Sequence, residues 1–479
     1  MMEFFQERFY QKEAADSVMN YFRDHEDPGN PIIALPTGTG KTIVLAGLCD
    51  RLLTQNPLAN ILVLSHSSEI IEQDYKALIY QFGDGIGIYS SGLGYTQIEK
   101  ITVAGIQTVN RRRDQFAHFD YVIVDEAHTI NPKQKGMYRN LLAEMTKNPK
   151  VIGLTATPYR LGSGYLHDGS ESIFDTITCD YSSGDKFQSL IDEGFLCPLI
   201  GKKTNYEMDT SDVKITGGDF NNKQLSRKLN REQITDQAVQ EVLRYGKKYK
   251  KWLFFAIDID HAERITRLLQ EHGISAGCVH SKMNGDRKPI LDQFRNGELR
   301  AMVNVNVLTT GFDVPDIDLI AMMRPTSSPV VHVQTLGRGT RPHPGKDHCL
   351  VMDFGGNIKR LGTIDDIVIK KKKKGKNQGG PMVKECKNCQ ALNHIRLREC
   401  QACGEPFEIK EKLTTSADES DAIRKKRKEE QEQLLRELTV TGESHHRHKK
   451  YGMPDSVCFR FTCGLQSFST WVCLDHEGY

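Results

Sequence analysis

The segment IIALPTGTGKT at residues 32–42 constrains the fold of this chain more than any other part of its sequence. An apolar run leads into a turn with two glycines, and a helix with one apolar side follows. A strand–turn–helix unit of this kind points backbone N–H groups and the positive end of a helix dipole at a phosphate. Lys41 can then reach the terminal phosphates of a nucleotide, and the Thr42 hydroxyl can bind magnesium. The segment departs from the pattern G-x-x-x-x-G-K-[ST] only at its first position, which is Leu35.

The second anchor is YVIVDEAH at residues 121–128, where four apolar residues end in two carboxylates. Asp125, at the tip of a predicted strand, can hold magnesium through water, because this small ion keeps several of its waters. Glu126 can orient or deprotonate the water that attacks the terminal phosphate. A strand that merely ends in surface acids is the alternative, and the neighbouring phosphate loop makes it the weaker one.

Strands and helices alternate around both motifs. The other predicted strands of this half lie at 61–64, 100–104 and 151–154. Residues 1–205 are therefore expected to form an α/β domain with a parallel sheet, in which ligands bind beyond the carboxyl ends of the strands. The pattern loosens at 206–230, which predicts a connector. A second alternating segment at 231–365 predicts another parallel α/β domain, and it has no phosphate loop.

The second domain contains QTLGRGTR at residues 334–341. Gln334, Arg338 and Arg341 have the spacing of one face of a helix. Arginine suits planar, bidentate contact with phosphate, so two arginines presented by a second domain can complete the phosphate site of the first. A basic surface helix is the alternative.

Two features of the first domain are weaker signals. Gln11 lies ahead of the phosphate loop, and its planar amide can pair with the hydrogen-bonding edges of an adenine. An amphipathic cap helix would explain the same residues. Thr155 and Thr157, at the end of the predicted strand 151–154, can relay a hydrogen bond between the hydrolysis site and a neighbouring polymer site.

Over residues 5–355 the ordered motifs resemble those of superfamily 2 helicases and translocases. They are Gln11, LPTGTGKT (35–42), DEAH (125–128), TAT (155–157), TTGFDVPDID (309–318) and QTLGRGTR (334–341). Within that superfamily the chain is similar to the RadD-like bacterial and phage DNA-repair helicases, through RxYQ, VNVNVLTTGFDVPDIDLIAMMRPT and GRGTRPHPGK. The resemblance implies two tandem RecA-like domains with ATP in the cleft between them and nucleic acid across both.

The resemblance also implies a role for individual residues. The implied nucleotide-binding residues are Arg8, Gln11, Pro36, Thr37, Gly38, Thr39, Gly40, Lys41, Thr42, Gly311 and Asp313. The implied catalytic residues are Lys41, Asp125, Glu126 and the arginine fingers Arg338 and Arg341, with Thr42 and Asp125 on magnesium. Coupling of hydrolysis to movement is implied for His128, Thr155, Thr157 and Gln334. Proximity to the nucleic-acid backbone is implied for Ser65, Gln107, Thr309 and Thr310.

Four cysteines follow the second domain in two C-x-x-C pairs: Cys386, Cys389, Cys400 and Cys403. Their spacing fits four thiolates around one tetrahedral zinc ion, and RadD-like proteins also have cysteine pairs here. The segment 385–410 has too little apolar content to fold by itself, so metal would carry its stability. A redox pair is the alternative chemistry. The expected ribbon would serve as a knob that grips duplex DNA, as a protein-docking module or as a structural closure.

The remaining tail divides into three segments. Residues 366–384 are rich in Lys and Gly and predict a flexible basic linker. Residues 411–450 predict a charged helix and a polar linker, and the linker is favoured over a metal site for its three histidines, His445, His446 and His448. Residues 451–479 are apolar and aromatic, which predicts hairpin strands, either of a complete segment or of a small domain cut short.

The composition and the distribution of apolar residues indicate in which cellular compartment the protein works. A net charge of +2, with 38% hydrophobic and 26% charged residues, is typical of an ordinary soluble chain. No apolar run is long enough to span a membrane, the N-terminus lacks an apolar signal core, and the cysteines outside the two pairs are scattered. We expect a cytoplasmic protein, bacterial or acting in the bacterial cytoplasm during phage infection, without a membrane partner.

The expected function is that of an ATP-dependent DNA helicase or translocase that uses Mg²⁺ and carries Zn²⁺. It would act as a monomer on forked, branched or partly single-stranded DNA in repair or recombination, with a single-strand-binding or other repair protein as partner. The motor subunit of a restriction or defence complex, or an RNA helicase, is the alternative. A scaffold with a dead ATP site is disfavoured, because the phosphate loop, the acid pair and the arginines are all intact.

Overall fold

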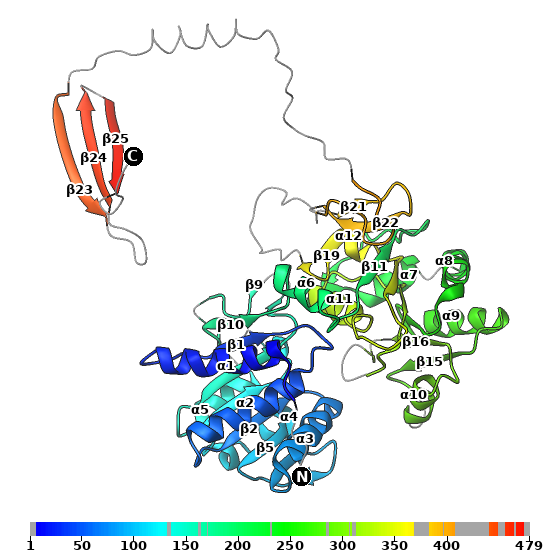
Figure 1. The fold of residues 1–479 in the computed structure, drawn as a ribbon, viewed down its shortest axis with the longest axis horizontal. Helices are drawn as coiled ribbons and strands as arrows, with labels where there is room; N and C mark the ends of the chain where they lie inside the picture. The colour runs from blue at the N-terminus through cyan, green and yellow to red at the C-terminus, as the bar shows by residue number, and fades with distance from the viewer. Residues whose placement is uncertain are drawn as a thin grey trace, which may run out of the picture. The chain divides into compact units, whose positions relative to one another are not determined.

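The computed structural model divides the chain into two units, residues 1–408 and 409–479, and each is described by itself (Figure 1). The described residues are 6–131, 136–160, 164–169, 171–229, 232–283, 287–305, 307–308, 313–367, 383–395, 397–407, 440–448, 456–463 and 466–473. Among them, no helix is both long enough and apolar enough to cross a membrane.

The first lobe is built on an eight-stranded sheet of order β10-β1-β7-β6-β2-β5-β3-β4. Its strands are β1 (Pro31–Ala34), β2 (Ile61–Ser65), β3 (Ile86–Ser90), β4 (Tyr95–Thr96), β5 (Ile101–Gly105), β6 (Tyr121–Val124), β7 (Lys150–Thr155) and β10 (Thr176–Asp180). All neighbours pair in parallel except β3 and β4. The carboxyl ends of β1, β6 and β7 therefore meet at one edge, and the three predicted motifs of this lobe follow those ends.

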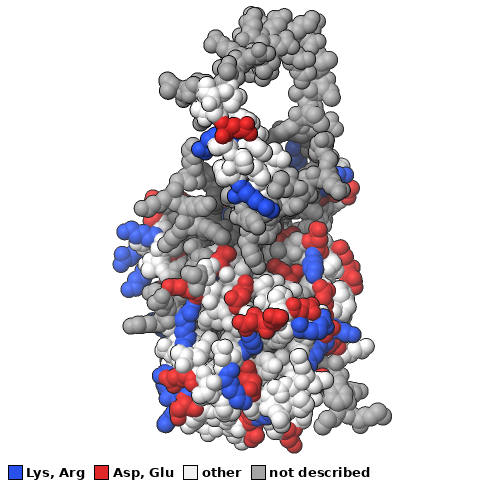
Figure 2. Space-filling model, turned by 90° about the vertical axis from the view of Figure 1, so that its left-hand side faces the viewer, with Lys and Arg blue, Asp and Glu red and all other residues white. Residues whose placement is uncertain are grey.

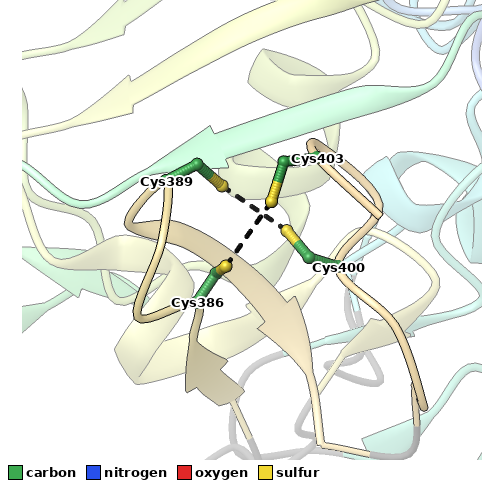
Figure 3. Close-up of side chains that lie close together, drawn as sticks. All are labelled: Cys386, Cys389, Cys400 and Cys403. Carbon is green, nitrogen blue, oxygen red and sulfur yellow. Dashed lines mark hydrogen bonds between the residues drawn. The ribbon is translucent and has the colours of Figure 1, made fainter. Parts of the chain in front are cut away.

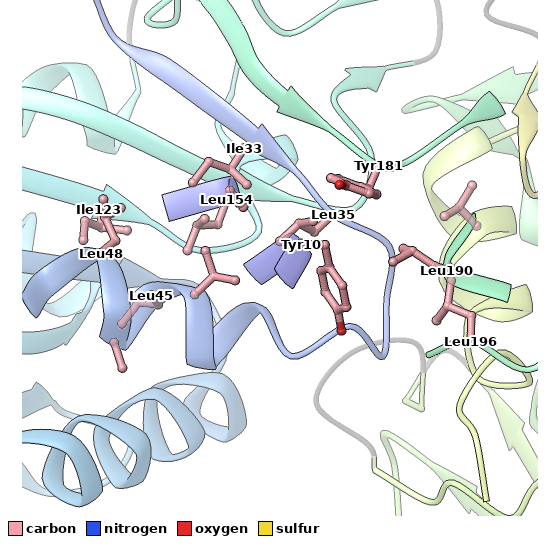
Figure 4. Packing of buried hydrophobic residues seen from close by; sticks show 14 of the residues in the cluster. Tyr10, Ile33, Leu35, Leu45, Leu48, Ile123, Leu154, Tyr181, Leu190 and Leu196 are labelled. Atoms are coloured by element: carbon pink, nitrogen blue, oxygen red, sulfur yellow. The ribbon is translucent and has the colours of Figure 1, made fainter. Parts of the chain in front are cut away.

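Helices cover both faces of this sheet. They are α1 (Phe9–Asp24), α2 (Lys41–Gln55), α3 (Ser68–Phe82), α4 (Ile106–Val109) and α5 (Met137–Glu144). Helix α1 packs on α2, and α2 packs on α3. Figure 4 shows Leu45 and Leu48 of α2 packed among Ile33, Leu154 and Ile123 of the sheet. The apolar side predicted for the helix after the phosphate loop therefore faces the core.

The second lobe is built on a second eight-stranded sheet, of order β15-β16-β14-β17-β18-β11-β22-β21. Its strands are β11 (Leu199–Lys202), β14 (Trp252–Phe255), β15 (Ala276–His280), β16 (Ala301–Val305), β17 (Leu319–Met322), β18 (Cys349–Asp353), β21 (Val383–Glu385) and β22 (Ala391–His394). Its main helices are α8 (Glu232–Tyr245), α9 (Ile259–Glu271), α10 (Lys288–Arg295), α11 (Pro329–Leu336) and α12 (Asn357–Leu361), and α6 (Gly184–Asp192) precedes β11. The first six strands of the order pair in parallel.

Two boundaries differ from the sequence-based expectation. Strand β11 lies within the range 1–205 expected for the first domain, but it pairs with β18 of the second sheet. The predicted ribbon is not a separate module, because β22 pairs antiparallel with β11 and β21 pairs with β22. The sequence could not reveal either fact, since pairing between strands that are distant in sequence leaves no local pattern.

The expected connector packs onto the second lobe. It contributes α7 (Asn222–Leu229) and a small hairpin of β12 (Ile215–Thr216) and β13 (Asp219–Phe220). Phe220 and Leu225 belong to the same buried cluster as Trp252. Asp219 accepts hydrogen bonds from the Thr326 hydroxyl at 2.9 Å and from the Ser327 backbone at 2.7 Å. The connector thereby fixes the loop that leads into α11.

The unit 409–479 contains a three-stranded antiparallel sheet of β23 (Gly442–His448), β24 (Ser456–Cys463) and β25 (Gln466–Cys473). The hairpin expected in 451–479 is therefore present. The polar linker expected at His445, His446 and His448 is wrong, because these residues lie in β23, paired with Phe459, Cys458 and Ser456. The basic linker at 368–382 and the charged helix predicted between Asp421 and Leu438 lie outside the described residues.

Candidate active site

The phosphate loop connects β1 to α2 as predicted. Gly38 and Gly40 have φ values of 86° and 77°, a left-handed conformation that glycine adopts without strain. The Thr39 hydroxyl donates to the Pro36 carbonyl at 2.7 Å, which closes the loop on itself. Lys41 begins α2, and its Nζ lies 3.5 Å from the Pro36 carbonyl. The loop backbone and the lysine are therefore held where a phosphate would bind at the helix N-terminus.

Two side chains of helix α1 hydrogen-bond to this loop. Tyr10 Oη and Gln11 Nε2 both donate to the Thr39 carbonyl, at 2.9 and 2.8 Å. Gln11 Oε1 accepts from the Arg8 backbone at 2.8 Å, and the Arg8 guanidinium lies 4.9 Å from the centre of the Phe195 ring. Both ends of the Gln11 amide are engaged by protein, so reading an adenine edge requires one of these bonds to be exchanged. In this structure Gln11 positions the phosphate loop.

The acid pair follows β6 at the same edge. Asp125 is buried, its carboxylate accepts from the Glu126 backbone at 2.8 Å, and Glu126 has a φ of 52°. A left-handed non-glycine residue stores backbone strain, which is common at functional sites. Burial and the neighbouring Glu126 raise the pKa of Asp125 to about 7, although Lys41 opposes the shift. The Asp125 carboxylate and the hydroxyl of Thr42, in the first turn of α2, offer oxygen donors of the kind that magnesium prefers.

A third carboxyl group in this region was not anticipated from the sequence. Asp74 on α3 is completely buried, and neither of its oxygens has a hydrogen-bond partner among the described residues. Burial raises the pKa of Asp74 well above its usual value, and the charges of Asp125 and Glu126 raise it further, while Lys41 lowers it. Helical spacing alone assigns position 74 to the core face, where a carboxylate is unexpected, and that conflict is the signal that could have found it.

His128 connects the acid pair to the second lobe. Its Nδ1 lies 3.3 Å from a Glu126 carboxylate oxygen and 3.0 Å from the Thr155 hydroxyl, and its Nε2 lies 3.3 Å from the amide nitrogen of Gln334. Burial lowers the pKa of His128, which favours the neutral ring. A neutral ring that accepts from Gln334 at Nε2 carries its proton on Nδ1, where it donates to the Thr155 hydroxyl, with the Glu126 carboxylate close by. The structure thus brings together three of the residues expected to act in coupling.

The loop after β7 surrounds this histidine. The Thr155 hydroxyl accepts from the Thr157 backbone at 3.0 Å, while the Thr157 hydroxyl is buried with no partner among the described residues. Arg160, which was not predicted as a site residue, donates from Nε to the His128 carbonyl at 2.8 Å. Residues 155–160 therefore contact both the backbone and the side chain of His128.

Two arginines of the second lobe face the phosphate loop. An added Cβ at Gly38 would lie 3.1 Å from Cγ of Arg341, and the Thr340 hydroxyl donates to the Thr37 carbonyl at 3.3 Å. Arg341 pairs with Asp313 at 3.1 Å. Burial lowers the pKa of Arg338 to about 9, and Glu126 is among the carboxylates that counteract this shift. Arg341 therefore lies against the phosphate loop, and Arg338 is close enough to Glu126 to interact with its charge.

The expectation that these arginines share a helix face with Gln334 is wrong in one respect. Helix α11 ends at Leu336, and Arg338 and Arg341 lie in the turn that follows. Gly337 and Gly339 follow the last helical residue, and glycine is unfavourable in a helix interior. Gly339 also lies where a side chain would not fit, since an added Cβ would lie 2.7 Å from Cys349 Sγ and 2.9 Å from Leu199. The turn nevertheless delivers both arginines to the cleft.

The residues expected near nucleic acid give a mixed result. Ser65 is completely buried, so its hydroxyl is not available to a strand in this structure. Gln107 is exposed and donates to the His66 carbonyl at 3.3 Å. His66, which was not predicted, lies 2.8 Å from the Thr129 hydroxyl at the same edge. Thr309, Thr310 and the nucleotide-binding candidate Gly311 lie outside the described residues.

The four predicted cysteines converge beside β11 (Figure 3). Their sulfur atoms lie within 4.8 Å of one another, with Cys386 to Cys403 at 3.7 Å and Cys389 to Cys400 at 3.5 Å. Zinc–sulfur bonds of about 2.3 Å in a tetrahedron require sulfur–sulfur distances of about 3.8 Å, so the cluster has the right size. Backbone and amide N–H groups of Ala402 and Asn393 point at Cys400 Sγ, as they do at a thiolate.

These observations define a class of protein. Two parallel α/β lobes, with a phosphate loop and an acid pair on one and two arginines presented by the other, form a tandem RecA-like nucleotide-binding fold. Residues 4–160 match the family described as type III restriction enzyme, res subunit, and residues 235–343 match the helicase conserved C-terminal domain. The chain belongs to the superfamily 2 helicases.

Individual relatives agree with this assignment. The Saccharomyces cerevisiae protein IRC3, named as an ATP-dependent helicase, is 32% identical over 368 residues, which cover 73% of this chain and 51% of that protein. The 51.5 kDa protein of a Lactococcus phage (isolate 7-9) is 26% identical over 389 residues, 80% of this chain and 79% of that protein. A fragment of an HsdR subunit of a type I restriction enzyme from Vibrio vulnificus shares the fold, with a TM-score of 0.56 at 22% identity, over 74% of this chain and 65% of that chain. The chain thus spans about half the length of IRC3.

The contact between the lobes predicts the effect of one small substitution. In Gly337→Ala the added Cβ would lie 1.6 Å from Thr37 Oγ1 and 2.8 Å from Thr37 Cβ, so the arginines cannot reach the phosphate loop. Steady-state ATPase should fall by about 10²-fold, the size of loss that follows a misplacement of about 1 Å, while binding of a fluorescent ATP analogue changes little. Adding Thr37→Gly removes both clashing atoms and should restore part of the activity. Wild-type turnover in Gly337→Ala would contradict the closed arrangement.

The buried carboxyl of Asp74 predicts a dependence of stability on pH. The folded-state pKa is raised, so as pH rises from about 4 the unfolded chain releases this proton first and the folded state loses stability. Asp74→Asn should therefore raise the melting temperature of the nucleotide-free protein more at about pH 8 than at about pH 5. The matched variant Asp50→Asn, at an exposed position of α2, should shift neither melting curve. An equal effect of Asp74→Asn at both pH values would show that the charge of Asp74 is not the cause.

Proposed function

We propose that the chain is a DNA-dependent ATPase that couples hydrolysis to movement on, or remodelling of, branched or forked DNA in repair and recombination. The observation that carries the proposal is the line of contacts from Glu126 through His128 to Gln334, which crosses from one lobe to the other. Through these contacts, a change at the terminal phosphate can be transmitted to the second lobe. A change in the position of the second lobe can likewise be transmitted to Glu126.

Each residue of the cleft has a task in the proposed hydrolysis. The loop N–H groups and Lys41 bind the nucleotide phosphates, and Thr42 and Asp125 would hold magnesium, which neutralises phosphate charge when it is bound. Glu126 orients the attacking water and accepts its proton. Arg338 and Arg341 stabilise the charge of the transferring phosphoryl group, a contribution of about 10³ to 10⁵ in rate in other P-loop enzymes. Closure of the lobes brings the arginines in, and hydrolysis releases them.

DNA is the proposed polymer substrate because the named relatives are a helicase and a restriction-enzyme subunit. Contacts to the phosphate backbone would give little sequence preference and a strong dependence on salt. A monomeric state and a single-strand-binding or other repair protein as partner remain part of the proposal. A second candidate is the motor subunit of a restriction or defence complex, favoured by the family match over residues 4–160.

Variants of the acid pair and the lysine test the proposed reaction. Lys41→Ala and Glu126→Gln should each lower the DNA-stimulated kcat by at least about 10²-fold, because they remove phosphate binding and the general base. Glu72→Gln, at an exposed ion pair on α3, is the matched control and should keep full turnover. ATPase and unwinding are measured with forked DNA, duplex, single strands and RNA. Preference for forks supports the repair proposal, preference for long unbranched duplex supports the restriction motor, and unchanged turnover in both variants would falsify the mechanism.

We propose further that the four cysteines hold Zn²⁺ and that the metal secures the edge of the second sheet. Lys202 in β11 donates from Nζ to the Cys389 carbonyl at 3.4 Å, and the Lys203 backbone donates to the Gln390 carbonyl at 3.2 Å. The ribbon and β11 therefore share an edge, which supports a structural role for the metal.

Removal of the metal tests this role. A chelator, or Cys400→Ser, should release one zinc per chain and speed hydrogen exchange at the amides of β22 and β11, while exchange in β1 and β7 stays constant. Cys278→Ser, at a cysteine remote from the cluster in sequence and on β15, is the control and should retain zinc. A chain that holds no zinc, or faster exchange throughout both sheets, would count against the proposal.

A further inference from the structure

A basic cavity lies on the second lobe, lined by loops that precede the strands of its sheet. Its volume is about 680 Å³. Lys247–Lys251 lead into β14, Arg300 precedes β16, and Asp318 precedes β17. The loops of the predicted motifs follow the carboxyl ends of strands, so this cavity uses the opposite ends. None of its lining residues belongs to the phosphate loop or the acid pair.

The cavity has a strong excess of positive charge. Seven lysines and arginines line it, against two aspartates. Lys251 is neutralised by Asp316 at 2.6 Å, and Arg295 pairs with Asp292 at 2.7 Å. On the face shown in Figure 2, by contrast, lysines and arginines lie among acids. A localised excess of this kind attracts polyanions.

The loop that carries the exposed lysines is held by its backbone. Asp318 accepts from the backbone N–H groups of Lys250 at 2.7 Å and of Lys251 at 2.9 Å. Arg300 donates to the carbonyls of Gly246 at 3.2 Å and Tyr249 at 2.6 Å. These bonds fix the course of the loop, so the side chains of Lys247, Lys248 and Lys250 project from an ordered support, and all three residues are exposed. Less ordering entropy is then lost when a ligand binds.

The aromatic residues of this region identify which phosphate ligand fits. Tyr249 and Trp252 are 6% and 1% exposed, so neither ring can stack on a base. Arg300 covers Trp252, with its guanidinium 4.3 Å from the ring centre. Binding of single strands depends on exposed stacking platforms, whereas duplex DNA offers only its backbone to lysines that do not enter a groove. Lysine point charges on flexible stems suit that contact.

We infer that this cavity binds the phosphate backbone of a duplex segment of the DNA substrate, apart from the strand held across the two lobes. The inference rests on the proposed DNA-dependent function and extends it. Lys247 and Lys250 make the phosphate contacts, and the other cations of the cavity add to the local field. Such a second contact would hold a duplex arm of a fork while the lobes cycle.

The test compares the full chain with Lys247→Ala/Lys250→Ala, using fluorescence anisotropy of a labelled duplex and of a short single strand. For the duplex, the slope of log K against log salt between about 50 and 200 mM should become shallower by about 1.8, or about 0.9 for each lost phosphate contact. The single-strand slope and the single-strand-stimulated kcat should stay at their wild-type values. Lys100→Ala/Lys147→Ala, which removes two lysines from loops that precede β5 and β7 in the first lobe, should leave the duplex slope unchanged.

Other outcomes overturn the inference. An unchanged duplex slope, or an equal change in the control variant, would remove the site. Lost binding of tripolyphosphate or poly-glutamate together with an unchanged duplex slope would assign the cavity to a free polyphosphate or an acidic protein. Failure of the proposed function is distinguishable, because it appears as an absence of DNA stimulation in the wild-type ATPase.

Discussion

The contact between Thr37 and the turn after α11 is the constraint on which the rest of this structure depends. Gly337 approaches Thr37 closely enough that even a methyl group does not fit, and Thr340 hydrogen-bonds to the Thr37 carbonyl. A P-loop lobe by itself offers phosphate binding, an acid pair and a lysine. In the proposed reaction, charge stabilisation on the far side of the phosphates comes from the second lobe, and the glycine at the point of closest approach allows this arrangement.

The electrostatics of the two lobes explains why this contact matters. Asp125, Glu126 and Asp74 crowd three carboxyl groups around one lysine in a buried region, and burial and mutual repulsion raise the pKa of both aspartates. Arg338 is buried and Arg341 is partly buried, and burial lowers the pKa of each. Each lobe thus carries buried or partly buried ionisable groups whose charged forms are costly to leave without a partner of opposite charge. In the proposed mechanism, nucleotide phosphates and a divalent cation would supply such partners, and closure would then depend on what the cleft contains.

Much of this site was predictable because its signals are local. Three features could be predicted from a few neighbouring residues, because local geometry determines them. They are the glycines of the phosphate loop, the strand that ends in Asp125 and Glu126, and the spacing of the cysteines. Features that depend on distant packing were not predictable. The close approach of Gly339 to Cys349 and Leu199 and the burial of Ser65 both depend on strands that are distant in sequence. Strands β11 and β22 have no local pattern that predicts their pairing with each other.

The shared edge of β11 and β22 has a mechanical consequence. Strand β11 directly follows the crossing from the first sheet to the second, and it carries the cysteine hairpin on its free side. Hydrogen bonds from Lys202 and Lys203 to the hairpin make the two parts one body. Any movement of the second lobe relative to the first would therefore carry the four cysteines with it, because they belong to the same rigid element.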